Sequence, residues 1–296
     1  MNSLPLVSIC IPTFNGGKYL QETLNSIQEQ TYSNIEVIVS DDKSMDKTLD
    51  IIEKFKPQSK FPVFLYHHKP KGIGANWNNC IKKANGEFIK FLFQDDVMEE
   101  NCIEEMISIY DENPAVGLIA SKRSFIIEQN AVGENTNNWI KKYEDLQSGL
   151  TQKKNNVLIL DKLVFKRNDF RKPPFNKIGE PSAVLFRKDI VNKIGYFRTD
   201  LRQILDYEFW YRILKQQPIL IINKPLVKFR IHQDQTTNEN NKRHINDYNI
   251  YDKILFKEYL NLLGEEDKLR LKHKYSLVSK IIRKLKFLFN VKMKVK

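Results

Sequence analysis

The chain has 296 residues, of which 41% are hydrophobic and 28% charged, and its formal net charge is +12. This length allows a substantial buried core, and the composition is that of a soluble globular protein. No apolar run reaches the roughly 18 residues of a membrane-spanning helix, and the first residues lack the apolar core of a signal peptide, so we expect a cytoplasmic protein.

Strand and helix patterns alternate along the first 121 residues. Apolar runs and helical spacing predict, in chain order, a strand at 7–11, a helix at 18–30, a strand at 35–40, a helix at 46–55, a strand at 64–67, a helix at 75–84, a strand at 88–93, a helix at 99–110 and a strand at 116–121. Apolar strands separated by helices are typical of an α/β fold with a mostly parallel sheet covered on both faces. We therefore predict a nucleotide-binding α/β half over residues 1–121.

The pattern changes after residue 121. Residues 122–177 are polar and aperiodic, which favours a functional loop or lid. Order returns with a strand at 183–186, helices at 188–194 and 206–215, strands at 219–222 and 226–230, and a helical region at 238–263. We predict that residues 122–235 complete the same domain and that residues 236–296 form a helical C-terminal extension.

The three cysteines, Cys10, Cys80 and Cys102, lie in apolar segments without metal-ligand spacing. They are expected to be small buried side chains without chemistry of their own.

Two pairs of carboxylates follow predicted strands. Asp41 and Asp42 come after the strand at 35–40, and Asp95 and Asp96 after the strand at 88–93. Ligands bind in the crevice outside the carboxyl ends of such strands, and clustered acids repel one another unless a cation or a donor joins them. A divalent metal carrying a phosphorylated ligand would satisfy both needs. Adjacent acids are also common in turns and helix caps, which is the alternative for either pair alone.

Five motifs carry a resemblance to a known family. They are VSICIPTFN at 7–15, DDKS at 41–44 followed by Asp46, GEFIKFLFQDD at 86–96, DYEFWYR at 206–212 and FRIH at 229–232. In this order, over roughly residues 5–235, they resemble the family 2 glycosyltransferases. The resemblance implies a GT-A fold, a nucleotide-sugar donor held by residues 1–121, an acceptor and catalytic base in residues 122–235, and inversion at the anomeric carbon.

The first two motifs contain candidate contacts to the nucleotide. Pro12, Thr13 and Asn15 leave the first strand at its carboxyl end, where a backbone fixed by proline can hold a base or ribose. An ordinary turn with Asn15 as a helix cap explains them equally well. The resemblance favours Asp42 over Asp41 as the residue that faces the base. A carboxylate suits uracil, which offers one N–H between two carbonyls.

The metal motif departs from the family pattern of Asp-X-Asp, often extended by another Asp. Here Phe93-Gln94-Asp95-Asp96 keeps only the last two acids. The resemblance implies that Asp96 binds Mn²⁺ or Mg²⁺, which prefer carboxylate and phosphate oxygens, and that Asp95 holds the ribose or donor sugar. With so few protein carboxylates, the affinity for metal should depend on bound nucleotide.

Further donor contacts follow from the same resemblance. Arg230 and His232 alternate at a strand end and point the same way. Arg230 is expected to bind the diphosphate and His232 to ligate the metal, although a solvated position is an even alternative. Asn78, with Asn76 before it, falls where relatives contact the donor.

Asp206 is the candidate general base. It opens an amphipathic helix, so its carboxylate can project into the crevice at the sheet edge. An inverting transfer needs one base to take the proton of the acceptor hydroxyl. A helix N-cap is the structural alternative for Asp206, and Glu208 is the alternative base. Residues 180–182 resemble the acceptor-side loop of the family.

The positive charge is concentrated at the C-terminus. No acid follows Asp267, whereas 11 lysines and arginines do, and the rest of the chain is nearly neutral. On a helix, the apolar residues of 277–289 form a stripe opposite a basic face, which is typical of a helix that lies on an anionic membrane. Nucleic acid is not expected as a partner, because the tail contains no recognisable binding module. Packing of this helix on the catalytic domain is the other alternative.

We therefore predict a cytoplasmic enzyme, peripheral on the inner face of the cell membrane. It would move a sugar from a UDP-sugar to a carbohydrate acceptor, lipid-linked in our interpretation, in bacterial surface-polysaccharide assembly. One alternative is a transferase that uses a TDP- or GDP-sugar. A sugar nucleotidyltransferase would need a glycine-rich phosphate loop, for which Gly16-Gly17 is too little. A non-catalytic nucleotide-binding or membrane scaffold protein is the third alternative.

Overall fold

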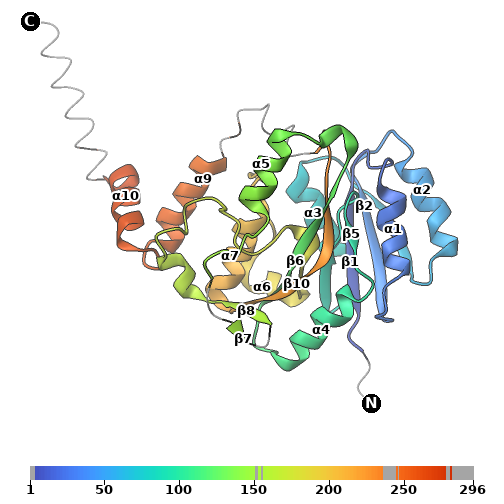
Figure 1. Ribbon diagram of the computed structural model, residues 1–296, viewed down its shortest axis with the longest axis horizontal. Coiled ribbons are helices and arrows are strands. Elements are labelled where there is room, and N and C mark those ends of the chain that lie inside the picture. The colour runs from blue at the N-terminus through green and yellow to red at the C-terminus, as the bar shows by residue number, and fades with distance from the viewer. Residues whose placement is uncertain are drawn as a thin grey trace, which may run out of the picture. The chain divides into compact units, whose positions relative to one another are not determined.

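The chain divides into two compact units, residues 1–161 with 176–245 and residues 162–175 with 246–296. The computed structural model (Figure 1) describes residues 4–150, 153–154, 156–235, 245, 247–277 and 281. The predicted membrane-binding tail, residues 276–296, lies outside these ranges except for residues 276, 277 and 281. Within the described ranges, no helix is both long enough and apolar enough to span a bilayer.

The first unit is built on a sheet with ten strands in its described part. The strands are β1 (Val7–Thr13), β2 (Ile35–Asp41), β3 (Val63–His67), β4 (Phe88–Phe91), β5 (Val97–Met98), β6 (Leu118–Ile127), β7 (Lys153–Lys154), β8 (Val157–Leu160), β9 (Val184–Arg187) and β10 (Ile219–Ile231). Their order is β3-β2-β1-β4-β9-β6-β10-β8-β7, and β5 pairs with β10. The α/β fold is confirmed.

The strand directions bring several carboxyl ends together. Strands β3, β2, β1 and β4 pair in parallel, as do β6 and β10, whereas β9 runs antiparallel to both β4 and β6. Strands β5 and β8 run antiparallel to β10, so the sheet is mixed. Strands β1, β2, β4, β6 and β10 therefore all end at one edge, the carboxyl edge. This edge positions every candidate site residue.

Strand β10 replaces the two separate strands predicted at 219–222 and 226–230. Its register with β6 shifts on both sides of Pro225. Such irregularities allow a strand to continue past a proline, which cannot donate to the ladder. The continuous strand carries Arg230 to the carboxyl edge.

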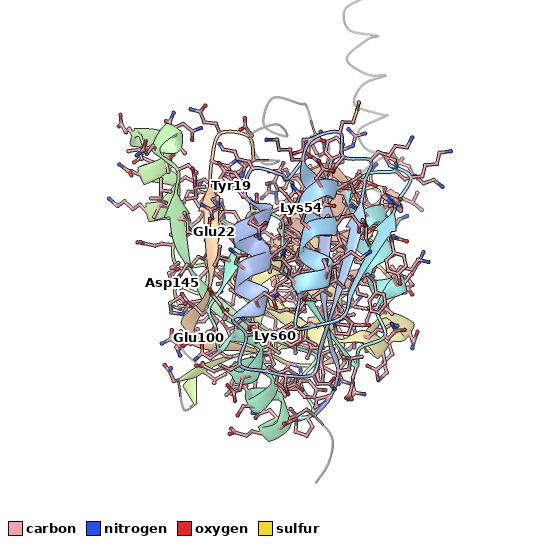
Figure 2. All side chains as sticks on the ribbon, turned by 90° about the vertical axis from the view of Figure 1, so that its right-hand side faces the viewer. Tyr19, Glu22, Lys54, Lys60, Glu100 and Asp145 are labelled. Atoms are coloured by element: carbon pink, nitrogen blue, oxygen red, sulfur yellow. The ribbon has the colours of Figure 1, made fainter. Side chains whose placement is uncertain are left out.

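Helices cover both faces of the sheet. They are α1 (Leu20–Gln28), α2 (Thr48–Phe55), α3 (Ile73–Lys83), α4 (Cys102–Glu112), α5 (Glu134–Tyr143), α6 (Val191–Ile194) and α7 (Leu205–Gln216). Short 3-10 turns occur at Lys56–Gln58, Gln129–Ala131, Pro181–Ala183 and Lys188–Ile190. Figure 2 looks onto α1 and α2, which lie side by side in front of the sheet.

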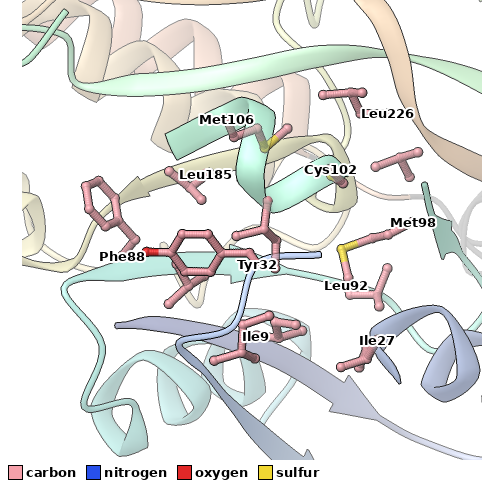
Figure 3. Close-up of a cluster of buried hydrophobic side chains, with 14 of the residues drawn as sticks. Ile9, Ile27, Tyr32, Phe88, Leu92, Met98, Cys102, Met106, Leu185 and Leu226 are labelled. Carbon is pink, nitrogen blue, oxygen red and sulfur yellow. The ribbon is translucent and has the colours of Figure 1, made fainter. Parts of the chain in front are cut away.

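The face covered by α1, α2 and α4 holds an aliphatic core (Figure 3). Ile9 and Phe88 of the sheet, Ile27 of α1 and Met106 of α4 belong to one buried cluster. Burying each such side chain contributes about 1.5–3 kcal/mol relative to leaving it in water. This apolar packing fixes α1 and α4 against the strands whose ends form the site.

The opposite face is held by aromatic side chains. Phe209 of α7 stacks on Phe197 with ring centroids 4.1 Å apart, and Phe197 also contacts Trp77 of α3 at 5.1 Å. Helix α7 ends just before β10 begins, so its first turn lies toward the carboxyl edge. The aromatic packing thereby holds Asp206 at that edge.

The stretch at 122–177, predicted to be a loop or lid, contains regular structure in its described part. Strand β6 continues to Ile127, and α5, β7 and β8 follow. None of the residues of α5 is fully buried. An exposed helix needs no apolar periodicity, and for this reason the sequence pattern did not reveal it.

The second unit is helical in its described part. It contains a 3-10 helix (Lys162–Lys166), α9 (Asp247–Ile254), a π-helical turn (Leu255–Tyr259) and α10 (Glu265–Tyr275). Phe165 packs on Tyr259 with ring centroids 5.4 Å apart, and Arg171 pairs with Asp252 and Asp267. The helix predicted within 238–263 is present where that region is described.

Candidate functional site

The first acid pair splits into a buried and a partly exposed member. Asp41, fully buried, accepts hydrogen bonds from the Thr13 hydroxyl at 2.8 Å and from the hydroxyl and N–H of Ser44 at 2.5 and 2.8 Å. These bonds close the turn after β2. Asp42 lies beyond the strand end with 13% of its side chain exposed. Of the two predicted nucleotide contacts, Asp42 is the accessible one.

Asp42 pairs with a residue that the sequence interpretation missed. Its Oδ1 lies 2.5 Å from Nδ1 of His68, whose side chain is 16% exposed. His68 directly follows β3, just as Asp42 directly follows β2. Position immediately after a strand was therefore the signal that could have identified His68. The pair places a carboxylate and an imidazole together at the carboxyl edge.

The turn after β1 is bound to the turn after β2. Asn15 adopts φ 49°, the left-handed region that asparagine tolerates better than most residues. Its N–H donates to the Ser44 hydroxyl and its Oδ1 accepts from the N–H of Met45, both at 2.8 Å. Pro12, half-buried, pairs in register with Ser40 of β2. Asn15 and Thr13 thus hold the two turns together through their side chains.

Gln94 also holds the turn after β1. Its Oε1 accepts from the N–H of Phe14 at 2.9 Å, and its Nε2 donates to the Phe14 carbonyl at 3.1 Å. A Cβ atom on Gly16 would lie only 2.2 Å from this Oε1, so glycine is required for the contact. Gln94 lies in the segment 93–96, which departs from the metal motif of the family. It therefore fixes the backbone of the turn after β1, beside the acids.

The second acid pair also splits. Asp96 is 1% exposed; its Oδ2 accepts from the Ser182 hydroxyl at 2.6 Å and its Oδ1 from the N–H of Arg230 at 3.1 Å. Burial, with a further contribution from the charge of Asp95, raises the pKa of Asp96 well above its usual range. Both carboxylate oxygens therefore have partners inside the protein, which leaves Asp96 an internal acceptor.

A buried amine of β4 contacts the loop that contains Ser182. Lys90 is fully buried, and its Nζ donates to the carbonyls of Ser182 and Phe91. Burial lowers the pKa of Lys90. Ser182 thus connects a buried lysine and a buried aspartate below the carboxyl edge.

Asp95 and His232 form the accessible part of the second cluster. Oδ2 of Asp95 lies 3.1 Å from Nε2 of His232, with 24% of the aspartate and 8% of the histidine side chain exposed. No group of three or more acidic, histidine or cysteine side chains suited to a metal occurs among the described residues. One carboxylate oxygen and one imidazole nitrogen nevertheless suit Mn²⁺ or Mg²⁺, which complete their shells with phosphate and water oxygens.

Arg230 is occupied by internal partners. Its guanidinium pairs with Glu22 at 2.5 Å and Glu128 at 2.7 Å, donates to the Asp95 carbonyl at 2.9 Å, and lies over the ring of Tyr19. Figure 2 shows Glu22 on α1 and Tyr19, the N-cap residue, at the start of the same helix. Arg230, with a side chain only 4% exposed, joins α1 to the ends of β6 and β10.

The two asparagines of α3 have different surroundings. Asn78 donates to the Phe197 carbonyl and accepts from the Phe197 N–H, both at 2.9 Å, so both ends of its amide are engaged. Asn76 donates weakly to the Thr13 carbonyl at 3.4 Å, and its buried Oδ1 has no hydrogen-bond partner in the described structure. Asn76, rather than Asn78, therefore retains a free acceptor behind the end of β1.

Asp206 lies in the first turn of α7. Its Oδ2 accepts from Nδ2 of Asn176 at 3.0 Å, whereas its Oδ1 has no hydrogen-bond partner in the described structure. Burial raises the pKa of Asp206 to about 7, against the lowering effect of the Tyr207 N–H, and the charge of Glu180 adds to the increase. A carboxylate with this pKa and with one oxygen that has no hydrogen-bond partner is suited to accept a proton at neutral pH.

One loop connects Asp206 to the acids at the strand ends. Asn176 accepts from the N–H groups of Ile178 and Gly179 at 3.0 and 3.1 Å, which fixes its amide toward Asp206. The same loop continues to Ser182, which binds Asp96. Residues 176–182 therefore link the two carboxylates.

Glu208, the alternative base, lies in the interior. Its side chain is 1% exposed and pairs with Arg212 at 3.0 Å. Helical geometry places residues two apart on different sides of a helix, so Asp206 and Glu208 cannot both face the crevice. Of the two, Glu208 is paired inside the protein, whereas Asp206 keeps one oxygen without a hydrogen-bond partner in the described structure.

The comparisons with known proteins follow this geometry. Residues 8–195 match the model of "Glycosyl transferase family 2", which is more than half of the chain. The chain belongs to this family.

Several curated proteins named as glycosyltransferases are similar to the chain. An uncharacterized glycosyltransferase of Rickettsia typhi is 29% identical over 234 residues, 79% of this chain and 66% of that protein. One of Rickettsia felis is 26% identical over 269 residues, 90% of this chain and 40% of that protein. The chain thus spans less than two thirds of the length of these relatives. The Campylobacter jejuni GalNAc(5)-diNAcBac-PP-undecaprenol beta-1,3-glucosyltransferase is 33% identical over 113 residues, 38% of this chain and 37% of that protein.

Solved structures share the fold. S. aureus TarS 1–349 in complex with UDP-GlcNAc has a TM-score of 0.65 at 20% identity, covering 92% of this chain and 73% of that one. The Pyrobaculum calidifontis mannosyltransferase PcManGT in complex with GDP-Man and Mn²⁺ has a TM-score of 0.55 at 15% identity, covering 97% and 81%. The prediction of a GT-A fold is confirmed by this likeness.

The structure separates the predicted family 2 site residues into two groups. Asp42, Asp95 and His232 keep 13%, 24% and 8% of their side chains exposed, and Oδ1 of Asp206 has no hydrogen-bond partner in the described structure. A second group is engaged in hydrogen bonds or ion pairs within the protein: Thr13, Asn15, Asp41, Asn78, Asp96 and Arg230.

Proposed function

We propose that the chain is an inverting, metal-dependent glycosyltransferase that moves a sugar from a UDP-sugar to a carbohydrate acceptor. The proposal rests on the environment of the Asp206 carboxylate. Its pKa is about 7, and one of its carboxylate oxygens lies unpartnered at the edge where the acids of β2 and β4 gather. An inverting transfer requires such a base on the acceptor side.

In this proposal Asp206 takes the proton of the acceptor hydroxyl as that oxygen attacks the anomeric carbon. Asn176 holds the other carboxylate oxygen and so keeps the open one directed toward the acceptor. Because the pKa of Asp206 is about 7, about half of the carboxylate is ionised at neutral pH, and it is basic enough to accept the proton.

We assign the metal to Asp95 and His232 instead of to Asp96 and His232. Both oxygens of Asp96 are engaged, whereas Asp95 and His232 present an oxygen and a nitrogen 3.1 Å apart. A divalent cation held there would neutralise the diphosphate leaving group. With only two protein ligands, its affinity should depend on bound nucleotide.

We assign base recognition to Asp42, supported by His68. The Asp42 carboxylate can accept the imide N–H of uracil. The TarS structure that shares the fold contains UDP-GlcNAc, which agrees with a UDP-sugar donor, whereas the more distant PcManGT structure contains GDP-Man. The donor base is therefore the first quantity to measure.

A donor screen tests the proposal. Purified protein is incubated with UDP-, TDP- and GDP-sugars and Mn²⁺, and released nucleoside diphosphate is quantified with and without EDTA. We expect release from a UDP-sugar that EDTA abolishes. Asp95→Asn should reduce it by about tenfold or more, as loss of a metal ligand does. Asp145→Asn, a surface aspartate paired with Lys122, is the matched control and should retain full activity.

Each other result of the screen has a defined meaning. Release from GDP- or TDP-sugars alone would overturn the assignment of Asp42 to uracil. Release that persists in EDTA would overturn the metal assignment. No release of nucleoside diphosphate from any donor would refute the proposed transferase activity and favour a non-catalytic nucleotide-binding protein.

We further propose a lipid-linked acceptor, in surface-polysaccharide assembly. The printed name of the Campylobacter jejuni relative contains PP-undecaprenol, which supports this acceptor class over the 113 aligned residues. Contact with an anionic membrane through residues 276–296, and hence a place on the inner face of the cell membrane, stays a prediction of the sequence. Most of these residues lie outside the described ranges.

A further inference from the structure

A cavity of about 580 Å³ lies beside α5 and the end of β10. Figure 1 and Figure 2 both show α5 next to β10, away from α2 on the other side of the unit. The volume is in the range of roughly 300–1,000 Å³ in which proteins bind small ligands. None of the residues discussed so far as nucleotide contacts at β1 and β2 lines this cavity.

The lining combines an aromatic surface with uncharged polar groups. Trp139 of α5 stacks on Phe229 of β10, with ring centroids 6.1 Å apart and planes inclined by 18°. Asn135, Thr136 and Gln235 also line the cavity. The Thr136 hydroxyl donates to the Ala131 carbonyl and the Gln235 amide to the Arg230 carbonyl, so the side-chain oxygens of Thr136 and Gln235 are left as acceptors. Aromatic faces against amides and hydroxyls suit a sugar, which presents C–H groups on one side and hydroxyls at its rim.

Charge argues against a phosphate in this cavity. Among the described residues that line it there is no lysine or arginine, and the one carboxylate is that of Glu134. A diphosphate would need cationic or N–H-rich surroundings. Away from His232, the lining therefore fits a neutral, polyhydroxylated ligand better than a diphosphate.

The cavity is connected to the proposed site at two points. His232 lines it and at the same time pairs with Asp95. Arg123 binds Glu180, in the loop that holds Asp206, and donates to the carbonyl of Tyr143 at the end of α5. The helix that carries Trp139 is thus joined by a buried arginine to the loop beside the general base.

From this arrangement we infer that the cavity is the subsite for the saccharide of the acceptor, with Trp139 as its stacking platform. The inference rests on the proposed function and deepens it. It assigns acceptor binding to α5, which lies outside the motifs that identify the family. It also separates the acceptor from the base of the nucleotide, which we assign to Asp42 after β2, and places the acceptor beside the diphosphate end of the donor at His232.

Binding of simple glycosides tests this inference directly. The probes are the p-nitrophenyl β-glycosides of glucose, galactose, N-acetylglucosamine and N-acetylgalactosamine, measured by saturation-transfer NMR and by titration of tryptophan fluorescence. We expect at least one to bind the wild type. Trp139→Ala should weaken that binding by about tenfold or more, as truncation of an aromatic anchor does. Trp139→Phe should keep it within about threefold, because a smaller ring still stacks.

Controls separate binding from folding. Tyr196→Ala removes another partly exposed aromatic ring, one that does not line the cavity, and should leave glycoside binding unchanged. Asn135→Ala, an exposed polar lining residue, should weaken binding about threefold without lowering the midpoint of thermal unfolding. UDP with Mn²⁺ should bind all four variants as it binds the wild type.

Three results would overturn the inference: displacement of the bound glycoside by UDP, equal glycoside binding by Trp139→Ala and wild type, or no binding of any glycoside to the wild type. Failure of the proposed function is recognised separately by the donor screen. If the wild type releases no nucleotide but binds glycosides through Trp139, the proposed transferase activity is refuted, whereas the carbohydrate subsite is supported. If it releases nucleotide but Trp139 has no effect, only the subsite is refuted.

Discussion

The strand-end region around Asp96 and the helix-start region around Asp206 each bury a carboxylate, yet their surroundings give it different roles. Burial raises the pKa of both residues. Asp96 has a donor on each oxygen, Ser182 on one and the Arg230 N–H on the other. Asp206 has a side-chain donor, Asn176, on only one oxygen. A raised pKa therefore does not by itself mark a base, and the unpartnered oxygen makes the distinction.

The comparison also shows how the site is built. In the strand-end region the buried residues Lys90, Asp96 and Arg230 form a rigid support, and the accessible pair Asp95 and His232 lies on it. In the helix-start region a single amide orients a single carboxylate. Changes to the buried residues of the first region should act mainly on stability, and changes in the second region mainly on turnover.

The largest expected effect is that of Asp206→Asn on turnover. The amide keeps the shape of the side chain but cannot accept a proton, so transfer should fall by about 10²–10⁴-fold while UDP binding is retained. In the wild type kcat/KM should rise with pH and level off above about pH 7, because the base must be deprotonated. Steady-state kinetics and calorimetry with UDP measure these quantities.

A surface variant controls for this result. Asp200→Asn changes an exposed aspartate that pairs with Arg198 and should leave kcat and the pH profile unchanged. Near-normal turnover of Asp206→Asn would transfer the role of base to another carboxylate. Glu180, 20% exposed on the same loop as Asn176, would be the next to test.

The next largest effect is expected on stability, from Ser182→Ala. Loss of this hydroxyl leaves one oxygen of buried Asp96 without its donor, which should cost about 1–3 kcal/mol in the free energy of unfolding. Ser121→Ala is a matched control, because the Ser121 hydroxyl is buried without a hydrogen-bond partner in the described structure. Its removal should cost little. Urea unfolding of both variants measures these changes in the free energy of unfolding. Equal losses of stability in the two variants would contradict the role assigned to Ser182.

Much of this arrangement could be predicted from the sequence, because it depends on local pattern. Apolar runs located the parallel strands, and the polar residues directly after them located the carboxyl edge. The amphipathic spacing from Asp206 onward predicted α7 and placed the carboxylate at its start. Helix α5 could not be predicted in this way, since it buries no residue fully.

The member of each acid pair that turns inward could not be predicted. Asp96 is engaged by Ser182 and Arg230, which lie 86 and 134 residues away in the sequence. Asp41 is fixed by Thr13, 28 residues away on the neighbouring strand. Such partners are set by sheet order and register, which neighbouring residues do not encode. For the same reason Arg230, a suitable phosphate ligand by residue type, proved to be paired with Glu22 and Glu128.

The smallest expected effect is that of Gln94→Ala, which tests whether the strand-end support also shapes the nucleotide site. The variant loses two hydrogen bonds to the Phe14 backbone, at an exposed position, and should cost about 1 kcal/mol in the free energy of unfolding. Because these bonds fix the turn after β1, the KM for the UDP-sugar should rise by about threefold while kcat stays the same. Gln21→Ala, which loses an exposed bond to Asn25 on α1, should change neither KM nor kcat. A fall in kcat without a change in KM would show that Gln94 acts on the transferred sugar rather than on the turn that holds the nucleotide.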